Sequence, residues 1–173
     1  MKQFDIYTDG SHLDKQNNGR LGIGGVLIDP TGPGMGTMLN KFSIELTPEY
    51  MNLSFGAQKC SNPSAELVAV LHALYEFRGS WGPNDIVVVH ADYLGVREWM
   101  TGNWKVKEPY IARIKGDIDK EIIKQEIKKI REVNVVSVGG FNGNCEVALY
   151  HSCFNKATIK KVVEEIDRKS TRL

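Results

Sequence analysis

The chain has 173 residues, of which 42% are hydrophobic and 25% are charged. This length predicts a single domain over residues 1–173 with a sizeable core, and the composition excludes a disordered chain. The formal net charge is +1, which excludes the strong overall positive field that many nucleic-acid binders carry. Any contact with nucleic acid must therefore depend on local clusters of charge.

The cysteines and the apolar runs bear on where the protein works. Cys60, Cys145 and Cys153 lack the paired spacing of a metal site, which is typical of reduced thiols in a cytosolic-type compartment. No apolar run is long enough to span a bilayer, and the first residues contain no apolar signal region. We therefore expect a cytoplasmic protein that does not contact membranes and needs no obligate protein partner.

The first part of the chain predicts three strands. Phe4–Thr8 alternates between polar and apolar residues and ends at the segment Asp9–Ser11. Leu21–Ile28 is rich in glycine and β-branched residues, which is typical of a buried strand with close neighbours. Met38–Leu46 alternates again, so the three strands predict an antiparallel meander. Residues 47–60 show little pattern and predict no element.

The rest of the chain predicts helices that alternate with strands. Ser61–Ser64 has the signals of a helix start, and the apolar residues that follow have the spacing of one helical face up to Gly79. After it come a strand at Ile86–Val89, helices at Gly95–Met100 and Pro109–Ile130, a strand at Val133–Val138 and a helix at Glu146–Asp167. This order predicts an α/β fold with a mixed five-stranded sheet, an antiparallel meander plus parallel strands, and helices on both faces.

Three carboxylates stand where strands or helices meet loops. Asp9 ends the first strand, Glu66 lies in the first turn of the first helix, and Asp92 follows the fourth strand. Strand ends of an open sheet often form sites, and a cluster of like charges is costly unless a cation neutralises it. Oxygen donors without a cysteine or histidine pair favour Mg²⁺ or Mn²⁺ over Zn²⁺. Taken singly, each residue also fits a local role, as a turn former, a partner of the helix dipole or a helix cap.

Four short motifs stand at the ends of these elements. They are Tyr7–Ser11, Ser61–Ala69, His90–Tyr93 and Asn103–Lys105. The first three resemble the acidic motifs of type 1 ribonuclease H, and the fourth resembles the tryptophan–lysine segment with which that family contacts its substrate. The resemblance extends from Phe4 to Ala157 and includes the order of the elements, so it implies a ribonuclease H-like fold.

This resemblance implies an endoribonuclease that hydrolyses the RNA strand of RNA/DNA hybrids. Asp9, Glu66 and Asp92 would then be catalytic metal ligands for two Mg²⁺ ions about 4 Å apart, with Mn²⁺ as a substitute. In that mechanism the ions bridge the scissile phosphate, and one activates a water while the other stabilises the leaving oxygen. The expected products carry a 5′-phosphate and a 3′-hydroxyl.

The resemblance also implies which residues bind the hybrid. They are Gly10, Ser11, Ser61, Asn62, Trp104 and Lys105. Ser61 and Asn62 match residues that contact a DNA phosphate and the minor groove, where 2′-hydroxyls distinguish RNA from DNA. Trp104 would pack on a deoxyribose, and Lys105 would contact a phosphate. The alternative is that these last two belong to a plain surface turn between helices.

The family carries a fourth carboxylate at the start of its last helix, and this sequence departs from that pattern. Aligned without gaps, Phe141 takes the place of a loop histidine and His151 takes that of the aspartate. With a short deletion, residues 145–148 match instead, and Leu149 replaces the aspartate. The gapless alignment makes His151 the candidate fourth catalytic metal ligand, which suits Mn²⁺ better than Mg²⁺. Helical spacing equally fits a histidine at the edge of the core.

Two other functions fit the same sequence. A nuclease of the same superfamily could act on another nucleic acid, such as a branched junction or a single-stranded end. The departures at Phe141 and His151 also fit a domain that binds nucleic acid or protein and does not cut. Cleavage of a labelled hybrid beside duplex and single-strand controls distinguishes the three.

Overall fold

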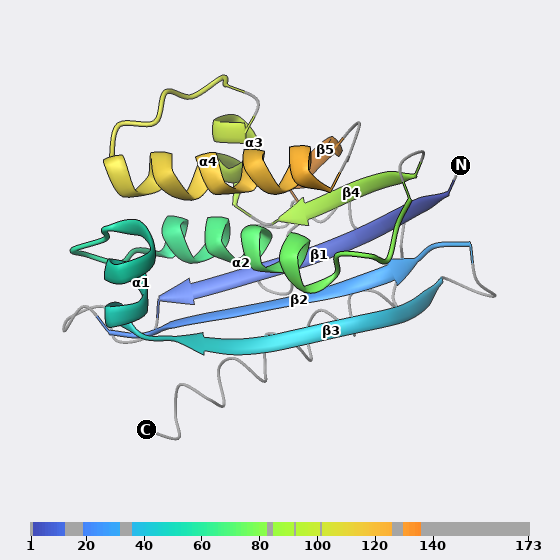
Figure 1. Cartoon of the computed structure of the whole chain (residues 1–173), viewed down its shortest axis with the longest axis horizontal. Helices are drawn as coiled ribbons and strands as arrows, with labels where there is room; N and C mark the ends of the chain where they lie inside the picture. The colour runs from blue at the N-terminus through green and yellow to red at the C-terminus, as the bar shows by residue number, and fades with distance from the viewer. Residues whose placement is uncertain are drawn as a thin grey trace.

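The structure, a computed structural model, describes residues 2–12, 19–31, 36–82, 85–91, 93–100, 102–125 and 130–135, the last stretch as backbone. Its strands are β1 (Gln3–His12), β2 (Leu21–Asp29), β3 (Thr37–Leu46), β4 (Ile86–Ala91) and β5 (Ile130–Val135). Its helices are α1 (Pro48–Phe55), α2 (Asn62–Glu76), α3 (Leu94–Met100) and α4 (Pro109–Lys124). Together they form a mixed α/β fold, with the helices stacked on a sheet (Figure 1).

The sheet has the strand order β3-β2-β1-β4-β5, so β1 lies inside it. β1 pairs with β2, and β2 with β3, in antiparallel fashion, which confirms the predicted meander. β4 pairs with β1 in parallel, from Gln3 beside Ile86 to Thr8 beside Ala91. Both strands are almost entirely buried, and each has a neighbouring strand along both of its edges.

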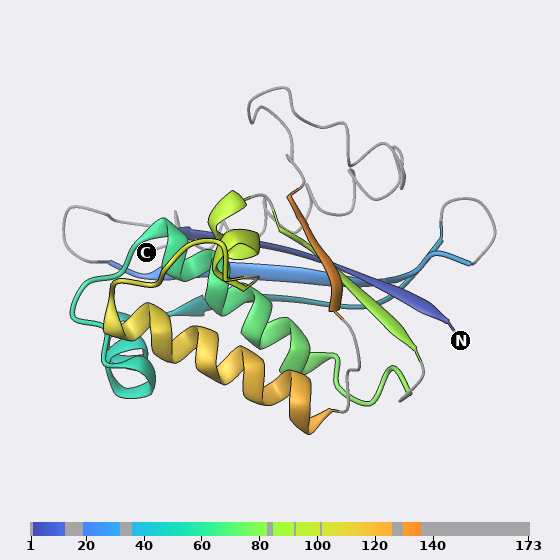
Figure 2. The same ribbon diagram turned by 90° about the horizontal axis from the view of Figure 1, so that it is seen from above.

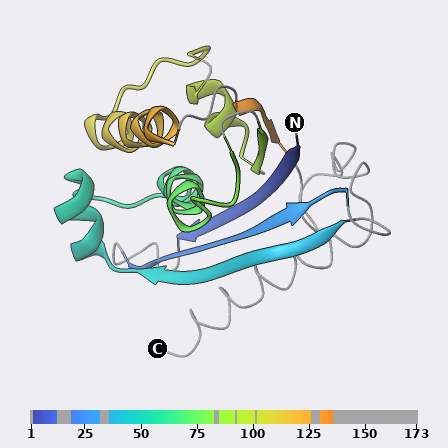
Figure 3. The same cartoon turned by 45° about the vertical axis from the view of Figure 1, so that its right-hand side comes forward.

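α2 lies over the strands and contributes much of the apolar core (Figure 3). Every residue from Ser64 to Val70 is buried, because α2 packs against β1 on one side and against α4 on another. Figure 2 shows α2 and α4 side by side above the sheet. α4 is amphipathic, and it buries Ile111, Ile114 and Ile118. Burying one such side chain stabilises the fold by roughly 1.5–3 kcal/mol, so this face alone fixes α4 on α2.

Two elements near the start of the chain differ from the predictions. β1 does not end at Thr8 but continues to His12, because Asp9–Ser11 pair with Gly22–Gly24 of β2 instead of turning. Residues 47–60, for which no element is predicted, contain α1. Its start has a recognisable signal: the Thr47 side chain accepts a hydrogen bond from the Tyr50 N–H at 3.1 Å, and a proline follows the cap.

The later elements differ in their bounds. α4 ends at Lys124, and β5 begins at Ile130, where the sequence predicts the end of the long helix. The described helices lie on the same side of the sheet (Figure 3). The helix predicted at Glu146–Asp167 lies outside the described residues, and so does any test of the prediction that helices cover both faces. Among the described helices, none combines the length and the apolar character needed to cross a bilayer.

Candidate functional site

The centre of the site is the end of β1 that extends past its neighbour β4. The parallel pairing ends at Thr8 beside Ala91, whereas β1 continues to His12 while still paired with β2. Within the described ranges, no strand pairs with residues 9–12 on the β4 side. The first turns of α2 lie above this end of β1 (Figure 1). β1 and α2 therefore meet at the end of β1 where, in the described part of the chain, the strand has no partner on the β4 side.

Gly10 brings β1 and α2 into backbone contact. A Cβ atom at this position would lie 2.4 Å from the carbonyl carbon and oxygen of Ala65 and 2.8 Å from the amide nitrogen of Glu66. No side chain fits such a gap, so glycine allows the strand and the helix to approach this closely. The contact places Asp9, the residue before Gly10, and Glu66 at the same junction of two elements.

Asp9 and Glu66 are both buried, with 7% and 6% of their surface exposed. Burying carboxylates is costly, and nearby like charges raise the cost, unless hydrogen bonds or a cation compensate. Ser11 Oγ, two residues beyond Asp9, is buried with no hydrogen-bond partner in the described part of the chain. The carboxylates of Asp9 and Glu66 and the hydroxyl of Ser11 supply oxygen ligands at the junction, which suit Mg²⁺ and Mn²⁺.

Hydrogen bonds fix the start of α2 at this junction. Ser61 is the N-cap: its side chain accepts from the Ser64 N–H at 3.3 Å, and the Ser64 hydroxyl oxygen accepts from the Ser61 N–H at 2.9 Å. This reciprocal pair is a capping box. The next residue, Asn62, accepts a hydrogen bond at Oδ1 from the His12 N–H at 2.7 Å. The N-terminus of α2 is thus tied directly to the end of β1.

An aromatic–basic pocket of about 320 Å³ opens beside the N-terminus of α2. Its lining includes three aromatic side chains and two lysines, together with Ser61 and one acidic residue: Tyr93, Trp99, Tyr110, Lys105, Lys107, Ser61 and Glu108. Tyr110 Oη lies 3.2 Å from Ser61 Oγ, and burial raises the pKa of Tyr110, so the phenol stays protonated at neutral pH. Trp104 is 42% exposed and packs edge-on against Trp99, with ring centroids 6.4 Å apart. Aromatic faces and ammonium groups together suit nucleic-acid bases and phosphates.

The predicted acidic residues are only partly within the described chain. Asp9 and Glu66 lie at the junction, whereas Asp92 and His151 lie outside the described residues. Ala91, which precedes Asp92, pairs with Thr8, which precedes Asp9. In the part of the chain that the structure describes, no group of three acidic, histidine or cysteine side chains could hold a metal ion. The described residues therefore supply two candidate ligands and leave the others untested.

The predicted substrate residues fall into two neighbouring groups. Gly10, Ser11 and Asn62 lie at the junction, and Lys105 lines the aromatic–basic pocket. Ser61 belongs to both groups, because it caps α2 and lines the pocket. Trp104 reaches the pocket through its contact with Trp99. All six predicted substrate residues thus lie around the start of α2.

Sequence reasoning missed the aromatic lining of this pocket. Tyr93, Trp99 and Tyr110 are separated along the chain by basic residues, and this interleaving is the signal that could have identified them. Sequence reasoning also missed a buried polar pair on β1 and β4. His90 Nε2 lies 3.2 Å from Asp5 Oδ1, and the His90 ring stacks on Tyr7 with centroids 4.3 Å apart. This pair ties β4 to β1 just before Asp9.

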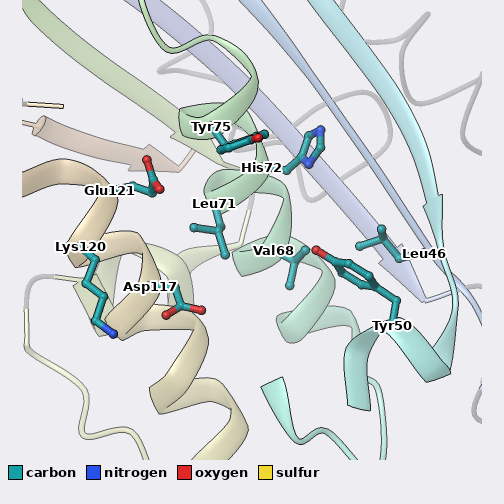
Figure 4. A pocket seen from close by; sticks show the side chains of 9 residues that line it. All are labelled: Leu46, Tyr50, Val68, Leu71, His72, Tyr75, Asp117, Lys120 and Glu121. Atoms are coloured by element: carbon teal, nitrogen blue, oxygen red, sulfur yellow. The ribbon is translucent and has the colours of Figure 1, made fainter. Parts of the chain in front are cut away.

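A second pocket, of about 410 Å³, lies between α1, α2 and α4 (Figure 4). Leu46, Val68, Leu71, Tyr50 and Tyr75 give it apolar and aromatic walls, while α4 contributes charged side chains at its rim. Burial lowers the pKa of His72, another lining residue, so this imidazole is neutral at pH 7. None of the predicted site residues lines this pocket.

Comparison with known proteins gives a likeness of structure alone. No model of a known protein family matches the chain, and no curated protein matches it. The solved ribonuclease H domain of prototype foamy virus is similar, with a TM-score of 0.59 and 19% identity over 99% of this chain and 96% of that one. LC11-RNase H1, isolated from compost by a metagenomic approach, has a TM-score of 0.58 and 22% identity over 98% and 99%.

A third structure shows LC11-RNase H1 in complex with an RNA/DNA hybrid. It matches with a TM-score of 0.53 and 22% identity over 83% of this chain and 91% of that one. The chain therefore has the ribonuclease H-like fold.

Proposed function

We propose that the protein is an endonuclease that hydrolyses the RNA strand of RNA/DNA hybrids with the help of Mg²⁺. The observation that carries the proposal is the contact at Gly10, which sets two buried carboxylates, Asp9 and Glu66, at the junction of β1 and α2. The fold supports it, since a ribonuclease H1 of the same fold has been solved with an RNA/DNA hybrid. The aromatic–basic pocket offers a surface suited to a strand of that duplex.

The oxygen donors at the junction fit Mg²⁺, with Mn²⁺ as a substitute. Asp9 and Glu66 would hold the metal from β1 and α2, and we propose Asp92 and His151, outside the described residues, as the remaining ligands of two ions. Bound Mg²⁺ supplies Lewis acidity at the phosphate and promotes ionisation of a water. The carboxylates would supply negative charge and hold the ions in position, so they need not transfer protons themselves.

Residues around the start of α2 would bind the duplex. The N-terminus of α2 and the Ser61 hydroxyl are suited to a phosphate, because helix N-termini attract anions. Lys105 and Lys107 are exposed and can neutralise further phosphates. The exposed Trp104 can pack on a sugar of the same strand. With a net charge of only +1, we expect modest affinity that falls steeply with added salt.

A cleavage assay tests the proposed function. The full chain is incubated with a labelled RNA/DNA hybrid, with single-stranded RNA, and with RNA and DNA duplexes of the same sequence, in Mg²⁺ or Mn²⁺. We expect cutting of the RNA strand of the hybrid alone, with 5′-phosphate and 3′-hydroxyl products, and no cutting in excess chelator. Equal cutting of single-stranded RNA, or full activity in chelator, contradicts the proposal.

A domain that binds the hybrid without cutting it is the second candidate. Two observations favour it: the aromatic–basic pocket is formed, and the sequence departs from the family's pattern at Phe141 and His151. The same assay distinguishes the candidates when it is paired with a gel-shift measurement. Retarded hybrid without products, in either metal, would support the binding domain and reject the nuclease.

We predict that Ser61→Ala weakens both the fold and the binding of hybrid. Loss of the N-cap lowers the free energy of unfolding by about 1 kcal/mol, and loss of a polar group from the pocket raises KM for the hybrid severalfold. Thr47→Ala is the matched control, because Thr47 is the N-cap of α1 and does not line the pocket. Denaturation and steady-state kinetics check both variants. An equal rise in KM in the two would remove Ser61 from the substrate surface.

A further inference from the structure

The hydrogen bond between His12 and Asn62 joins two segments that are far apart in sequence. The backbone N–H of His12, the last residue of β1, donates to Oδ1 of Asn62, the first residue of α2, at 2.7 Å. Because the donor is a backbone N–H, the atom of Asn62 that faces it is the amide oxygen. Asn62 is exposed, and this contact uses only its amide oxygen. The amide oxygen of Asn62 is thus used in a hydrogen bond within the protein, whereas its amide nitrogen is available to a ligand.

This hydrogen bond joins the two elements that carry the carboxylates. His12 is three residues beyond Asp9 on β1, and Asn62 precedes Glu66 by about one helical turn. Between them, Gly10 contacts the backbone of Ala65. α2 packs along β1, and near the end of the strand this packing includes a backbone contact at Gly10 and a side-chain hydrogen bond at His12. The hydrogen bond is the polar contact that holds the last residue of β1 against the first residue of α2.

The backbone around Asn62 is held in place by the start of the helix. Ser61 and Ser64 form the capping box immediately around it, and the Ser64 hydroxyl also donates to the Ser61 carbonyl at 2.7 Å. Pro63 follows Asn62 and restricts the backbone further. The acceptor that meets the His12 N–H is therefore presented from a rigid turn.

We propose that Asn62 is a positioning residue whose amide oxygen locks the end of β1 onto α2 and so sets Asp9 and Glu66 in register. The expected effect on catalysis rests on the proposed function, whereas the holding of β1 on α2 by Asn62 does not. Two atoms of the Asn62 side chain thus have different roles. The amide oxygen holds β1 on α2, and the amide nitrogen is available to contact the substrate. A residue that only contacted substrate would leave the geometry of the junction unchanged when removed.

Two substitutions separate these properties. Asn62→Asp keeps an oxygen that can accept from the His12 N–H and removes the amide donor, whereas Asn62→Ala removes both. Asn52→Ala is the matched control, because Asn52 is an exposed asparagine of α1, outside the junction. The measurements are hydrogen exchange of the His12 amide, backbone chemical shifts of Gly10 and Glu66, and steady-state kinetics on the labelled hybrid.

We expect Asn62→Ala to speed exchange of the His12 amide, to shift the Gly10 and Glu66 resonances and to lower kcat about tenfold or more, since small misplacements in a site can cost about 100-fold. Asn62→Asp should keep the protection, the shifts and most of kcat, while KM rises. Asn52→Ala should change none of them. Unchanged His12 exchange in Asn62→Ala overturns the lock. So does a loss of kcat in Asn62→Asp equal to that in Asn62→Ala while the amide stays protected.

The spectroscopic results do not depend on cutting. If the wild-type chain cuts no hybrid, the proposed function fails, and the exchange and chemical-shift results still decide whether Asn62 holds β1 on α2. If the chain cuts but Asn62→Ala leaves exchange and shifts unchanged, the proposed function survives and the lock is rejected.

Discussion

Asp9→Asn is expected to abolish cutting of the hybrid without unfolding the protein. The asparagine side chain has nearly the same shape and can occupy the same buried position, but it cannot supply the negative charge that a divalent cation requires. Losing one such electrostatic contact in a water-excluded site typically costs 10²–10³-fold in rate, so we expect kcat to fall roughly 1000-fold. Gel-based cleavage at saturating hybrid and Mg²⁺ measures the loss.

The thermal stability of Asp9→Asn, unlike its activity, should not fall. In wild type without metal, Asp9 is a buried carboxyl group, and holding a negative charge in a buried position is costly. Asp9→Asn removes this cost, so its Tm without metal should equal or exceed that of wild type. Addition of Mg²⁺ should then raise the Tm of wild type more than that of the variant. A variant with unchanged kcat, or one that fails to fold, contradicts this role for Asp9.

Asp29→Asn is the control for the charge change. Asp29 also stands at the end of a strand, but its carboxylate pairs with Lys2 at 2.6 Å on the surface. The Lys2 ammonium, with help from Thr31, lowers the pKa of Asp29 to about 2. A lowered pKa means that the stabilisation is present above the ordinary pKa of 3.8 and is lost as the pH falls through about 2. Asp29→Asn should therefore cost less than about 1 kcal/mol at pH 7 and leave cutting unchanged.

Gly10→Ala is expected to reduce both stability and activity strongly. The added methyl group would lie 2.4 Å from the backbone of Ala65, and neither β1 nor α2 can move without disturbing the core between them. Overpacking of this kind costs typically 1–3 kcal/mol, and we expect the upper part of that range because the obstacle is backbone. Displacement of the helix by even 1 Å would also lower kcat by about 100-fold.

Gly116→Ala is the matched control for this change. Gly116 lies in α4, and a Cβ atom there has no atom within 4 Å among its neighbours. Alanine favours the helix over glycine by roughly 0.5–1 kcal/mol, so this variant should be more stable than wild type and equally active. Urea denaturation and cleavage kinetics check both variants. A Gly10→Ala protein with wild-type stability would show that the strand and the helix are not packed as closely as described.

Patterns in the sequence predicted the elements with strong periodicity and failed where pairing partners decide the outcome. The meander and the helix at residues 62–76 follow from alternation and from the capping signals at Ser61. The end of β1 does not, because Asp9, Gly10 and Ser11 are turn-forming residues that pairing with β2 holds extended. The start of β5 is likewise set by its pairing with β4 rather than by its own pattern.

The site was predictable to the extent that it lies in local motifs. Asp9 and Glu66 come from such motifs, and the structure brings their segments together at Gly10. The contact between Tyr110 and Ser61 has no local signal, because it depends on how α4 crosses α2. The same holds for His12 and Asn62, whose bond forms only when β1 and α2 are docked.

The parallel pairing of β1 with β4 has a consequence for how the chain is made. Gln3 is synthesised before its partner Ile86, which leaves the ribosome only after the meander and α2 have been made. At typical synthesis rates of about 5–20 residues per second, one edge of β1 stays unpaired for several seconds before that partner is made. Non-local pairing of this kind is slow and leaves an apolar strand edge available to other chains. We expect nascent chains stalled before residue 86 to bind chaperones, and chains released after β4 to escape them.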